Sequence, residues 1–443
     1  MSKQKIYFRA DAGTGIGYGH FTRSLALADM LKSDFECTMF TQEPTPYQIS
    51  EAEKVCPLVS FPADESKFEK FLEYLTGEEI VVLDNYFYTT EYQQQIKDRG
   101  CKLVCIDDIH DRHFVADEVI TSLKYAMLRP AFFEKRTVNK IPGSWLITIG
   151  GLDEPNVTEK MVRMLQMQGI TQLTAIVGDG YQYQNSLAAC DIRVLSRLSA
   201  EKMASTFAQT ENVVCCASTV CYEALSQECH VYAGWYVDNQ EEIYRLLAES
   251  NYIEPLGNLL ELSSIEIKQK NTLTKINFDK VRPNIRSIFY RLALRMVNYV
   301  DMTESESRQV WETHNLPQIR KWMRNKTPFG FESHCTFVES LRKAKGKFYY
   351  AFFMGDELVG AYNFIDVQPH VVESGIFIHP AWQRKRLGDI IEDKMEGLAK
   401  AMGVAVIVAD VYLGNKQSRN YFIRNKFKEV SRDEDFIHFE KSL

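Results

Sequence analysis

The N-terminal part of this chain alternates short apolar runs, rich in β-branched residues, with amphipathic helical stretches, and this pattern constrains the fold more than any other feature. The run Ile6–Ala10, for example, precedes the stretch His20–Lys32, in which Leu25, Ala28 and Leu31 recur at helical spacing. Buried strands that alternate with helices are joined by crossovers and form parallel sheets. We therefore expect an α/β fold, in which ligands bind beyond the carboxyl ends of the strands.

Two polar stretches divide the chain. Arg136–Gly143 separates two α/β parts of similar size, and Ser263–Pro283 separates both from a third part with a hairpin and one strand–helix–strand unit, which is typical of an α+β domain. We predict three domains, at residues 1–138, 139–290 and 297–443. The other strands and helices that we expect are Ile80–Asp84, Lys102–Asp107, Trp145–Ile149, Leu173–Val177, Asn212–Cys216, His230–Trp235, Val297–Met302, Tyr349–Phe353, Leu358–Phe364, Ser374–Ile378, Leu387–Met402, Val404–Val411 and Gln417–Asn425.

Charge and cysteine content exclude several classes of protein. The 443 residues include 52 lysines and arginines and 59 aspartates and glutamates, a net charge of −7, whereas a general nucleic-acid binder needs a basic excess. No apolar run approaches the roughly 18 residues of a membrane span. The ten cysteines show no CxxC pair and no metal-ligand spacing, so we expect buried thiols in a reducing cytoplasm and no metal. We interpret the acidic run Asp107–His113 as a polar loop.

A glycine-rich segment follows the first expected strand. Its sequence, DAGTGIGYGH from Asp11 to His20, lets the backbone approach a ligand closely, and the helix amides behind it favour an anionic group. The segment has neither the GxGxxG fingerprint nor a P-loop lysine. His20 lies where the loop meets the helix, and a histidine there can act as a general acid or base. The alternative is a packed histidine that caps the helix.

Several blocks of sequence, taken in order, point to a known family. The first is FRADAGTGIGYGHFTRSLALADML, and the later ones are Leu83–Tyr86, Cys105–Asp108, Lys124–Phe132, Thr148–Asp153, Ala217–Leu225 and Asp238–Gln240. Together they resemble the UDP-sugar hydrolases of pseudaminic acid biosynthesis, which are related to the UDP-GlcNAc transferase of peptidoglycan synthesis. The resemblance covers roughly residues 5–260 and implies two Rossmann-like domains in a GT-B arrangement.

The resemblance implies hydrolysis of UDP-2,4-diacetamido-2,4,6-trideoxy-β-L-altropyranose to UDP and the free sugar, with water attacking the anomeric carbon. His20 is the expected catalytic residue, which would position or deprotonate the water or assist the leaving group. Glu223 is implied to bind the ribose hydroxyls. The substrate-binding residues that we expect are Gly17, Gly19, Arg23, Asp84, Tyr86, Gly150, Gly151, Ser218, Thr219, Glu223, Asn239 and Gln240.

Some of these residues have a physical role apart from the resemblance. Gly150 and Gly151 can bring backbone N–H groups to a diphosphate, and Ser218 can cap a helix or bind phosphate. The sequence also departs from the family. Leu152 replaces the usual Ser or Thr after the paired glycines, and Cys216–Ala217 replaces a Gly-Gly pair.

The third part resembles the GNAT acetyltransferases, and in particular an enzyme that acetylates the 4-amino group of a UDP-amino-sugar one step earlier in the same pathway. The resemblance rests on Ile319–Asn325, Glu332–Leu341, Leu358–Gly360 and Ile376–Asp389. It implies acetyl-CoA as cosubstrate, with loop amides that hold the coenzyme A pyrophosphate. The implied cofactor-binding residues are Ile378, Gln383, Arg384, Lys385, Arg386, Leu387, Gly388 and Asn415.

This part departs from the family at positions that matter for catalysis. Arg386 stands where the loop has its first glycine, and Lys426 where a later glycine is usual. Phe422 occupies the position of the tyrosine that serves as general acid, and the adjacent Tyr421 would point about 100° away on an α-helix.

We therefore expect a fusion of two enzymes that act on UDP-linked amino-deoxy sugars. One part would acetylate the 4-amine with acetyl-CoA, and the other would hydrolyse the UDP bond. Two alternatives remain open: a GT-B glycosyltransferase that uses an acceptor sugar in place of water, and a hydrolase whose GNAT domain only binds.

Overall fold

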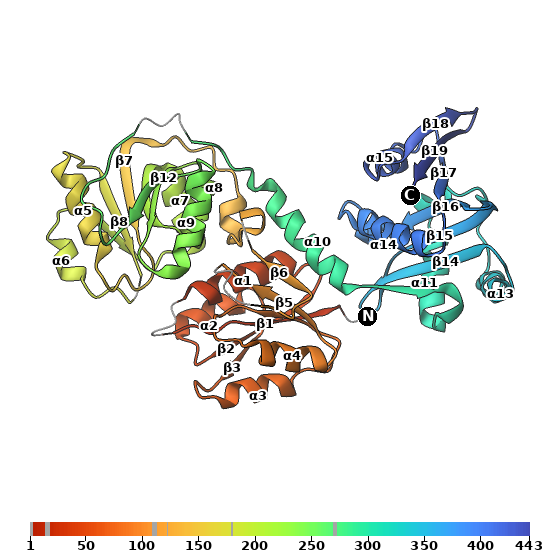
Figure 1. Ribbon diagram of the computed structural model, residues 1–443, viewed down its shortest axis with the longest axis horizontal. Coiled ribbons are helices and arrows are strands. Elements are labelled where there is room, and N and C mark those ends of the chain that lie inside the picture. The colour runs from red at the N-terminus through yellow and green to blue at the C-terminus, as the bar shows by residue number, and fades with distance from the viewer. Residues whose placement is uncertain (1–2, 14–17, 109–112, 122, 179, 269–272) are drawn as a thin grey trace. The chain divides into compact units, whose positions relative to one another are not determined.

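The computed structural model describes residues 3–13, 18–108, 113–121, 123–178, 180–268 and 273–443 (Figure 1). They form two compact units. The larger is Lys5–Arg286, and the smaller is Ser287–Leu443 together with the chain before Lys5. The boundary between the units falls within helix α10 (Val281–Ala293). The predicted division of the larger unit near residue 138 stays a prediction.

The first sheet of the larger unit is parallel throughout. Its strand order is β3-β2-β1-β4-β5-β6, which is the order of Rossmann folds, with the reversal between β1 and β4. The strands are β1 (Lys5–Arg9), β2 (Glu36–Gln42), β3 (Leu58–Phe61), β4 (Ile80–Leu83), β5 (Lys102–Ile106) and β6 (Glu118–Ile120). The helices that connect them are α1 (Gly19–Leu31), α2 (Pro46–Glu53), α3 (Ser66–Glu73) and α4 (Thr90–Asp98).

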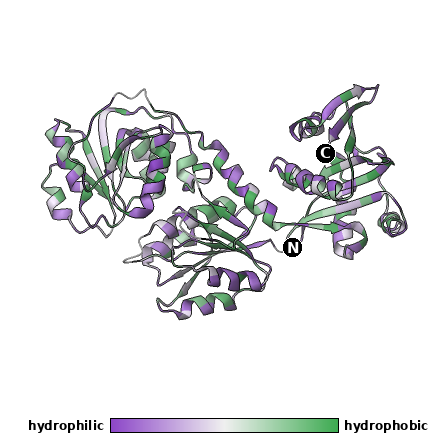
Figure 2. Cartoon of the chain, viewed as in Figure 1, coloured by the Kyte–Doolittle hydropathy of each residue, from purple (hydrophilic) through white to green (hydrophobic). Residues whose placement is uncertain are grey.

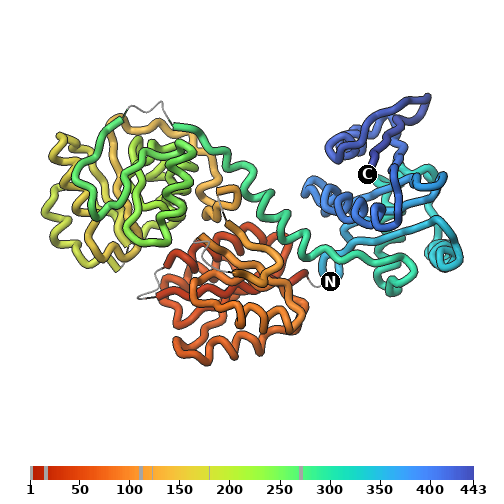
Figure 3. The backbone as a smooth tube through the Cα atoms, viewed as in Figure 1, coloured from red at the N-terminus to blue at the C-terminus, as the bar shows by residue number. Residues whose placement is uncertain are grey.

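The second sheet of the larger unit repeats this topology. Its order is β12-β11-β10-β7-β8-β9, again parallel, with the reversal between β7 and β10. The strands are β7 (Ile141–Thr148), β8 (Leu173–Val177), β9 (Arg193–Ser196), β10 (Thr210–Cys216), β11 (His230–Trp235) and β12 (Glu254–Asn258). The helices are α5 (Val157–Met167), α6 (Gln184–Ala188), α7 (Ala200–Gln209), α8 (Thr219–Ser226) and α9 (Glu241–Glu249), as the tube in Figure 3 traces.

Parallel strands covered by helices on both faces explain the apolar runs of the sequence. The four residues of β4 are all buried, and Figure 2 shows apolar colouring along the central strands of the sheets. The α/β prediction for this part is confirmed. Because crevices open where the strand order reverses, the topology places two candidate sites, beyond β1 and β4 and beyond β7 and β10.

The smaller unit has one sheet, of order β13-β14-β15-β16-β17-β19-β18. All its pairs are antiparallel except β16–β17, which the crossover helix α14 connects, so the predicted α+β pattern is confirmed. The strands are β13 (Leu294–Asn298), β14 (Lys347–Met354), β15 (Glu357–Gln368), β16 (Val371–Ile378), β17 (Val406–Tyr412), β18 (Lys428–Arg432) and β19 (Phe436–Ser442). The helices are α11 (Glu304–Asn315), α12 (Pro317–Arg320), α13 (Phe331–Leu341), α14 (Leu387–Ala401) and α15 (Lys416–Arg424).

Some predicted boundaries were wrong. The strand expected at Val297–Met302 ends at Asn298, whose side chain accepts from the backbone N of Val300 and starts a 3-10 turn. The polar stretch Arg136–Gly143 is not wholly a connection, because its last three residues belong to β7. Seven strands were not predicted: β2, β3, β6, β9, β12, β18 and β19. These strands are short, alternate with polar residues, or contain proline and glycine.

Candidate active sites

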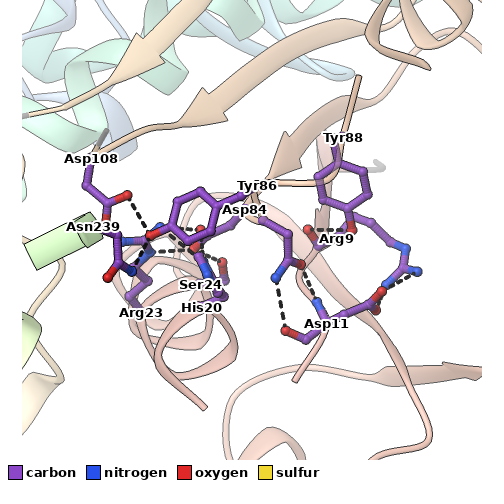
Figure 4. Close-up of polar contacts among 11 residues, drawn as sticks. Arg9, Asp11, His20, Arg23, Ser24, Asp84, Tyr86, Tyr88, Asp108 and Asn239 are labelled. Carbon is purple, nitrogen blue, oxygen red and sulfur yellow. Dashed lines mark hydrogen bonds and ion pairs between the residues drawn. The ribbon is translucent and has the colours of Figure 1, made fainter. Parts of the chain in front are cut away.

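His20 lies in the first turn of α1, just after the glycine-rich loop that follows β1. Its side chain is buried, and Nδ1 lies 2.8 Å from Oδ1 of Asp84, the residue that directly follows β4 (Figure 4). An ionised carboxylate only accepts hydrogen bonds, so the 2.8 Å contact with Asp84 requires a proton on Nδ1; we assign the tautomer on this shorter contact, although Arg23 Nη2 also lies 3.1 Å from Nδ1. Nε2 is thereby left as the ring nitrogen that can exchange a proton with a ligand.

Asp84 is fully buried and accepts several charged or polar donors. Arg23 donates from Nε (2.8 Å) and Nη2 (2.5 Å), and Ser24 donates from its hydroxyl (2.9 Å). Burial alone would raise the pKa of Asp84, but the charges and hydrogen bonds of Arg23 and His20 lower it to about 2. Asp84 is therefore an anion that fixes the orientation of the imidazole.

This pKa predicts how stability depends on pH. Because the folded pKa of Asp84 is about 2, below the unfolded value near 3.9, its contribution is fully present above pH 4 to 5. It is lost as the pH falls through 2. We expect the free energy of unfolding to fall more steeply between about pH 5 and pH 2 in the wild type than in Asp84→Asn. Denaturant titrations at a series of pH values measure this, and equal slopes would contradict it.

A second set of contacts extends from Arg23 to the other sheet. Arg23 Nη1 donates to Asp108 (2.6 Å), and the hydroxyl of Tyr86 donates to the other oxygen of Asp108 (2.8 Å). Asn239, in the 3-10 turn after β11, donates to the Tyr86 hydroxyl (2.9 Å). The Tyr86 ring meets the imidazole of His20 edge-on, with centroids 4.7 Å apart. Burial and Asp108 raise the pKa of Tyr86, so it remains a neutral hydroxyl.

The loops after β7 and β10 form the second candidate site. Gly150 and Gly151 follow β7, and Ser218 occupies the N-cap position of α8 without a side-chain capping bond. The thiol of Cys216 lies 3.1 Å from the Ile149 carbonyl oxygen and 3.3 Å from the Ser218 hydroxyl oxygen. The cysteine that replaces a family glycine therefore joins the two loops, while the Ser218–Thr219 amides remain at a helix N-terminus that suits phosphate.

Two residues that the sequence analysis missed support this second site. Gly178 directly follows β8, and a Cβ built there would lie 2.3 Å from the Gly151 carbonyl oxygen, so only glycine fits. Arg129 binds both oxygens of Glu223, with Nε to Oε1 at 2.7 Å and Nη2 to Oε2 at 3.0 Å. Glu223 itself is buried. The glycine of VGDG and the arginine of LRP were visible signals in the sequence.

The structure brings most of the predicted substrate residues together. Contacts connect His20, Arg23, Asp84, Tyr86 and Asn239, and a Cβ at Gly151 would lie 3.7 Å from the Tyr18 ring, next to Gly19. Gln240 is buried and accepts from the backbone N of Tyr236 instead of facing the Tyr86 cluster. Gly17 lies outside the described residues. Thr219 begins α8 beside Ser218.

The described residues contain no group of three or more histidine, cysteine or acidic side chains that could hold a metal ion. Nor does any described helix combine the length and hydropathy needed to cross a bilayer. Within the part of the chain that the structure describes, all ten cysteines are thiols and nine of them are buried.

The candidate site of the smaller unit is an opening in its sheet. β16 pairs with β17 only through Val371–Glu373, so the remainder of β16, as far as Ile378, separates from its parallel neighbour. The predicted coenzyme loop, Gln383–Gly388, follows β16 and leads into the N-terminus of α14. A strand edge without a partner strand and a helix N-terminus together suit an extended ligand with a pyrophosphate.

The two cations at glycine positions keep the backbone conformation that glycine favours. Arg386 has φ 63° and Lys426 φ 67°, both in the left-handed region. Arg386 caps the start of α14 and donates to Asp389 from Nε at 3.0 Å. The backbone of the loop therefore has the conformation that glycine would adopt at this position. The other predicted residues have varied surroundings. Arg384 is also in the left-handed region, Lys385 lies over the Trp382 ring, and Gln383 donates to the Ile378 carbonyl. Leu387 is buried, Gly388 lies against Tyr421, and Asn415 caps α15.

The phenol next to the usual general-acid position is already engaged. Tyr421 donates its hydroxyl to Oε2 of the buried Glu392 at 2.5 Å, whereas Phe422 packs against Phe427 and Phe439. Burial raises the pKa of Glu392, although Tyr421 and Lys441 oppose this. The two neighbouring rings lie edge to face with centroids 5.0 Å apart, but their other contacts are to different groups.

A cavity of about 630 Å³ in the smaller unit was not predicted. It is lined by Arg324, Asn325, Lys326, Asp410, Tyr412, Asp433, Asp435, Phe436 and His438. Arg324 binds Glu373 of β16 (2.5 Å) and Asp410 of β17 (2.8 Å), the two strands that diverge. His438 Nδ1 lies 2.8 Å from Asp410, and hydrogen bonds to Asp410 and then Asp433 raise the pKa of His438. Carboxylates beside the opening suit an amine-bearing acceptor.

Comparison with known proteins assigns a family to the smaller unit. Residues 315–427 match the acetyltransferase (GNAT) family. This match lies within the smaller unit and covers the opening in its sheet.

Particular relatives extend the comparison. Acetyltransferase PseH of Campylobacter jejuni is 23% identical over 146 residues, which are 33% of this chain and 91% of that protein. The UDP-2,4-diacetamido-2,4,6-trideoxy-beta-L-altropyranose hydrolase of Campylobacter jejuni is 23% identical over 278 residues, covering 56% of this chain and 97% of that protein. The crystal structure of Campylobacter jejuni N-acetyltransferase PseH with acetyl coenzyme A is 19% identical, covers 34% of this chain and 98% of that chain, and has a TM-score of 0.28. The chain thus combines a part similar to the hydrolase with a part similar to the acetyltransferase, and the resemblance stated from the sequence is confirmed.

Proposed function

We propose that this chain is a bifunctional enzyme of pseudaminic acid biosynthesis. The larger unit would hydrolyse UDP-2,4-diacetamido-2,4,6-trideoxy-β-L-altropyranose to UDP and the free sugar, as the name of its curated relative states for that protein. The smaller unit would transfer an acetyl group from acetyl-CoA to the 4-amine of the precursor UDP-amino-sugar. The relative named as an acetyltransferase and the family match support this second activity.

One observation carries the hydrolase proposal: the buried Asp84 holds Nδ1 of His20 and so leaves Nε2 for the reaction. In the proposed step, a water oxygen bonds to the anomeric carbon as the bond from that carbon to the UDP oxygen breaks. His20 takes the proton of the water through Nε2. The Tyr86 ring adjoins His20, and Asn239 donates to the Tyr86 hydroxyl, so these two side chains would orient the water and the sugar.

The negative charge that develops on the leaving UDP would be stabilised at the second candidate site. The amides after Gly150 and at the start of α8 would stabilise the diphosphate, since fixed dipoles aimed at developing charge lower the barrier. Glu223 would accept from the ribose hydroxyls. We further propose that domains 1–138 and 139–290 have a GT-B arrangement and that 297–443 is the third domain. Support comes from the Rossmann strand order of both sheets and from the approach of Gly151 to Tyr18.

For the acetyl transfer, the amine nitrogen would attack the thioester carbonyl carbon, the carbon–sulfur bond would break, and coenzyme A would leave as a thiolate. In this proposal Asp410, which lines the cavity where β16 and β17 separate, would receive the proton that the amine loses. The residues fit the cosubstrate: the β16 edge is open beyond Glu373, and the left-handed loop presents the amides of α14. Acetyl-CoA supplies the activated acetyl group when bound.

The experiment that tests both activities uses the full chain and separate readouts. UDP release from the diacetamido UDP-sugar without any acceptor supports the hydrolase. Release only in the presence of an acceptor sugar would support the glycosyltransferase instead. Free thiol formed from acetyl-CoA and the 4-amino precursor supports the acetyltransferase.

A GNAT unit that binds without catalysing is the second candidate for the smaller unit. The engaged hydroxyl of Tyr421 and the packed ring of Phe422 favour it, because no phenol at either position serves the thiolate. Calorimetric binding of acetyl-CoA without thiol release would establish this candidate. For the proposed enzyme we expect both binding and release.

Tyr421→Phe separates a structural from a catalytic role for this phenol. We expect a loss of about 1–3 kcal/mol in the free energy of unfolding, because Glu392 loses its 2.5 Å donor in a buried site. The acetyl-transfer rate per folded molecule should change by no more than about twofold. A loss of about tenfold or more in that rate, with the fold retained, would make Tyr421 the general acid and refute our interpretation.

The cysteine chemistry agrees with the predicted cytoplasmic location. Nine buried thiols in the described chain suit a reducing compartment, where sugar nucleotides and acetyl-CoA are also available. We therefore propose that both reactions take place in the cytoplasm.

A further inference from the structure

The carboxylate of Glu223 is held by a charged partner from a distant part of the chain. Arg129 precedes the 3-10 turn Pro130–Phe133, after the first sheet of the larger unit, whereas Glu223 lies on α8 of the second. The side chain of Glu223 is 4% exposed and that of Arg129 16%. Neither charge is solvated enough to be an ordinary surface pair, so the contact holds the carboxylate in one orientation.

The geometry leaves Glu223 with a defined capacity for further hydrogen bonds. Arg129 donates one N–H to each carboxylate oxygen, at 2.7 and 3.0 Å. Each oxygen of a carboxylate has two lone-pair sites, so one site on each oxygen remains. Because the guanidinium faces both oxygens at once, the two remaining sites point away from each other along opposite edges of the carboxylate, and a ribose 2′-hydroxyl can donate to one of them. A 2′-deoxyribose lacks this donor.

Arg129 is itself fixed by its surroundings. Its Nη2 lies 3.0 Å from the sulfur of Met203 on α7, and its guanidinium lies over the Phe132 ring, 5.1 Å from the centroid. A lysine could retain the charge, but it lacks the planar fork that holds both oxygens at once. The orientation of the Glu223 plane therefore depends on arginine, and not only on a positive charge.

We propose that Arg129 is a positioning residue that sets the preference of the nucleotide site for ribose over 2′-deoxyribose, by orienting Glu223. The proposal rests on the UDP site of the proposed function and adds a determinant of specificity to it. Arg129 need not touch the nucleotide, since it acts through the carboxylate.

The test measures the binding of UDP and of 2′-deoxy-UDP to the full chain by calorimetry. For the wild type we expect UDP to bind about tenfold or more tightly, because one hydrogen bond to a charged acceptor is lost with the deoxy compound. In Arg129→Lys and in Glu223→Gln the ratio of the two dissociation constants should fall to about two. Arg136→Lys, an arginine of the same segment that pairs with the exposed Glu134, is the matched control and should keep the wild-type ratio.

A merely structural role for Arg129 has a different signature. It would weaken both nucleotides by the same factor and leave the ratio unchanged, which overturns the proposal. If Arg129→Lys fails to fold, the double variant Arg129→Met with Glu223→Met removes both buried charges together and avoids an unpaired one. A ratio near one in this variant supports Glu223 as the acceptor on which the proposal rests, and the wild-type ratio there overturns the proposal.

Failure of the proposal and failure of the proposed hydrolase are distinguishable. Equal affinity of the wild type for UDP and 2′-deoxy-UDP overturns the proposal even if UDP release from the sugar nucleotide is rapid. A preference for UDP that Arg129→Lys abolishes supports the proposal even if no hydrolysis is found. No binding of either nucleotide to the wild type overturns both.

Discussion

Replacement of His20 by alanine is expected to lower the rate of UDP release from the diacetamido UDP-sugar by about 10²- to 10⁴-fold. The reason is geometric: Nε2 is the ring nitrogen left available once Nδ1 binds the buried Asp84 at 2.8 Å. Alanine keeps the helix and removes only the proton acceptor. The rate is measured at equal concentrations of folded protein, with circular dichroism and a melting curve as the check on folding.

Two further variants make the His20 result specific. Asp84→Asn presents an amide whose NH2 group can bond to Nδ1 and favour the wrong tautomer, so we expect a loss of similar size. It also removes one of the two carboxylates that pair with the buried Arg23, which keeps Asp108, at a cost of up to about 3–5 kcal/mol, so its melting curve must be measured first. His113→Ala, an exposed histidine of the same half, is the matched control and should leave the rate unchanged.

The outcome of the His20 experiment decides between roles. If UDP release is unchanged in His20→Ala, the proposed hydrolase activity stands but His20 is not its catalytic residue. If the rate is lost, the pH dependence of kcat/KM in the wild type assigns the direction of proton transfer. A base gains activity as the pH rises through its titration, and an acid loses activity over the same range.

Gly178→Ala is expected to weaken both the fold and the binding of UDP. The added Cβ would lie 2.3 Å from the Gly151 carbonyl oxygen and 2.5 Å from its Cα, and both are backbone atoms that no rotamer change can move. The loop after β7 must shift away from β8. We expect a loss of about 1–3 kcal/mol in stability and a rise of at least tenfold in the dissociation constant of UDP.

The control for Gly178→Ala is another glycine-to-alanine change in the same chain. Gly397 lies within α14, and a Cβ there would contact nothing within 4 Å, so Gly397→Ala should raise stability by up to about 1 kcal/mol. Denaturant unfolding and UDP calorimetry measure both variants. Normal UDP affinity in Gly178→Ala would show that the close approach of the two loops has no part in binding the diphosphate.

The sequence predicted the elements whose signals are local. Apolar runs such as Leu173–Val177 and His230–Trp235 coincide with strands, because a strand that is covered on both faces must be apolar along its whole length. Edge strands were missed for the same reason. Glu118–Ile120 and Glu254–Asn258 are short or contain proline and glycine, and only pairing with a neighbouring strand makes them part of a sheet.

The candidate site followed the same division. His20, Asp84 and Tyr86 could be proposed because each follows a strand whose carboxyl end the periodicity revealed. The contact of Arg23 with Asp108 and that of Asn239 with Tyr86 could not be predicted, because the two residues of each pair are separated by 85 and 153 positions in the chain, respectively. Contacts between such distant segments depend on strand order, which periodicity does not encode.

The sequence by itself determined the alternation of buried strands with helices, the motifs at the ends of those strands and the two relationships that the comparisons confirmed. Only the tertiary structure decided which charges meet and which backbones come close. Arg129 and Glu223 are 94 positions apart, and Gly178 has meaning only beside Gly151. Local sequence controls the backbone through hydrogen bonding and burial, whereas the partners of a buried charge are set by how whole sheets and helices pack.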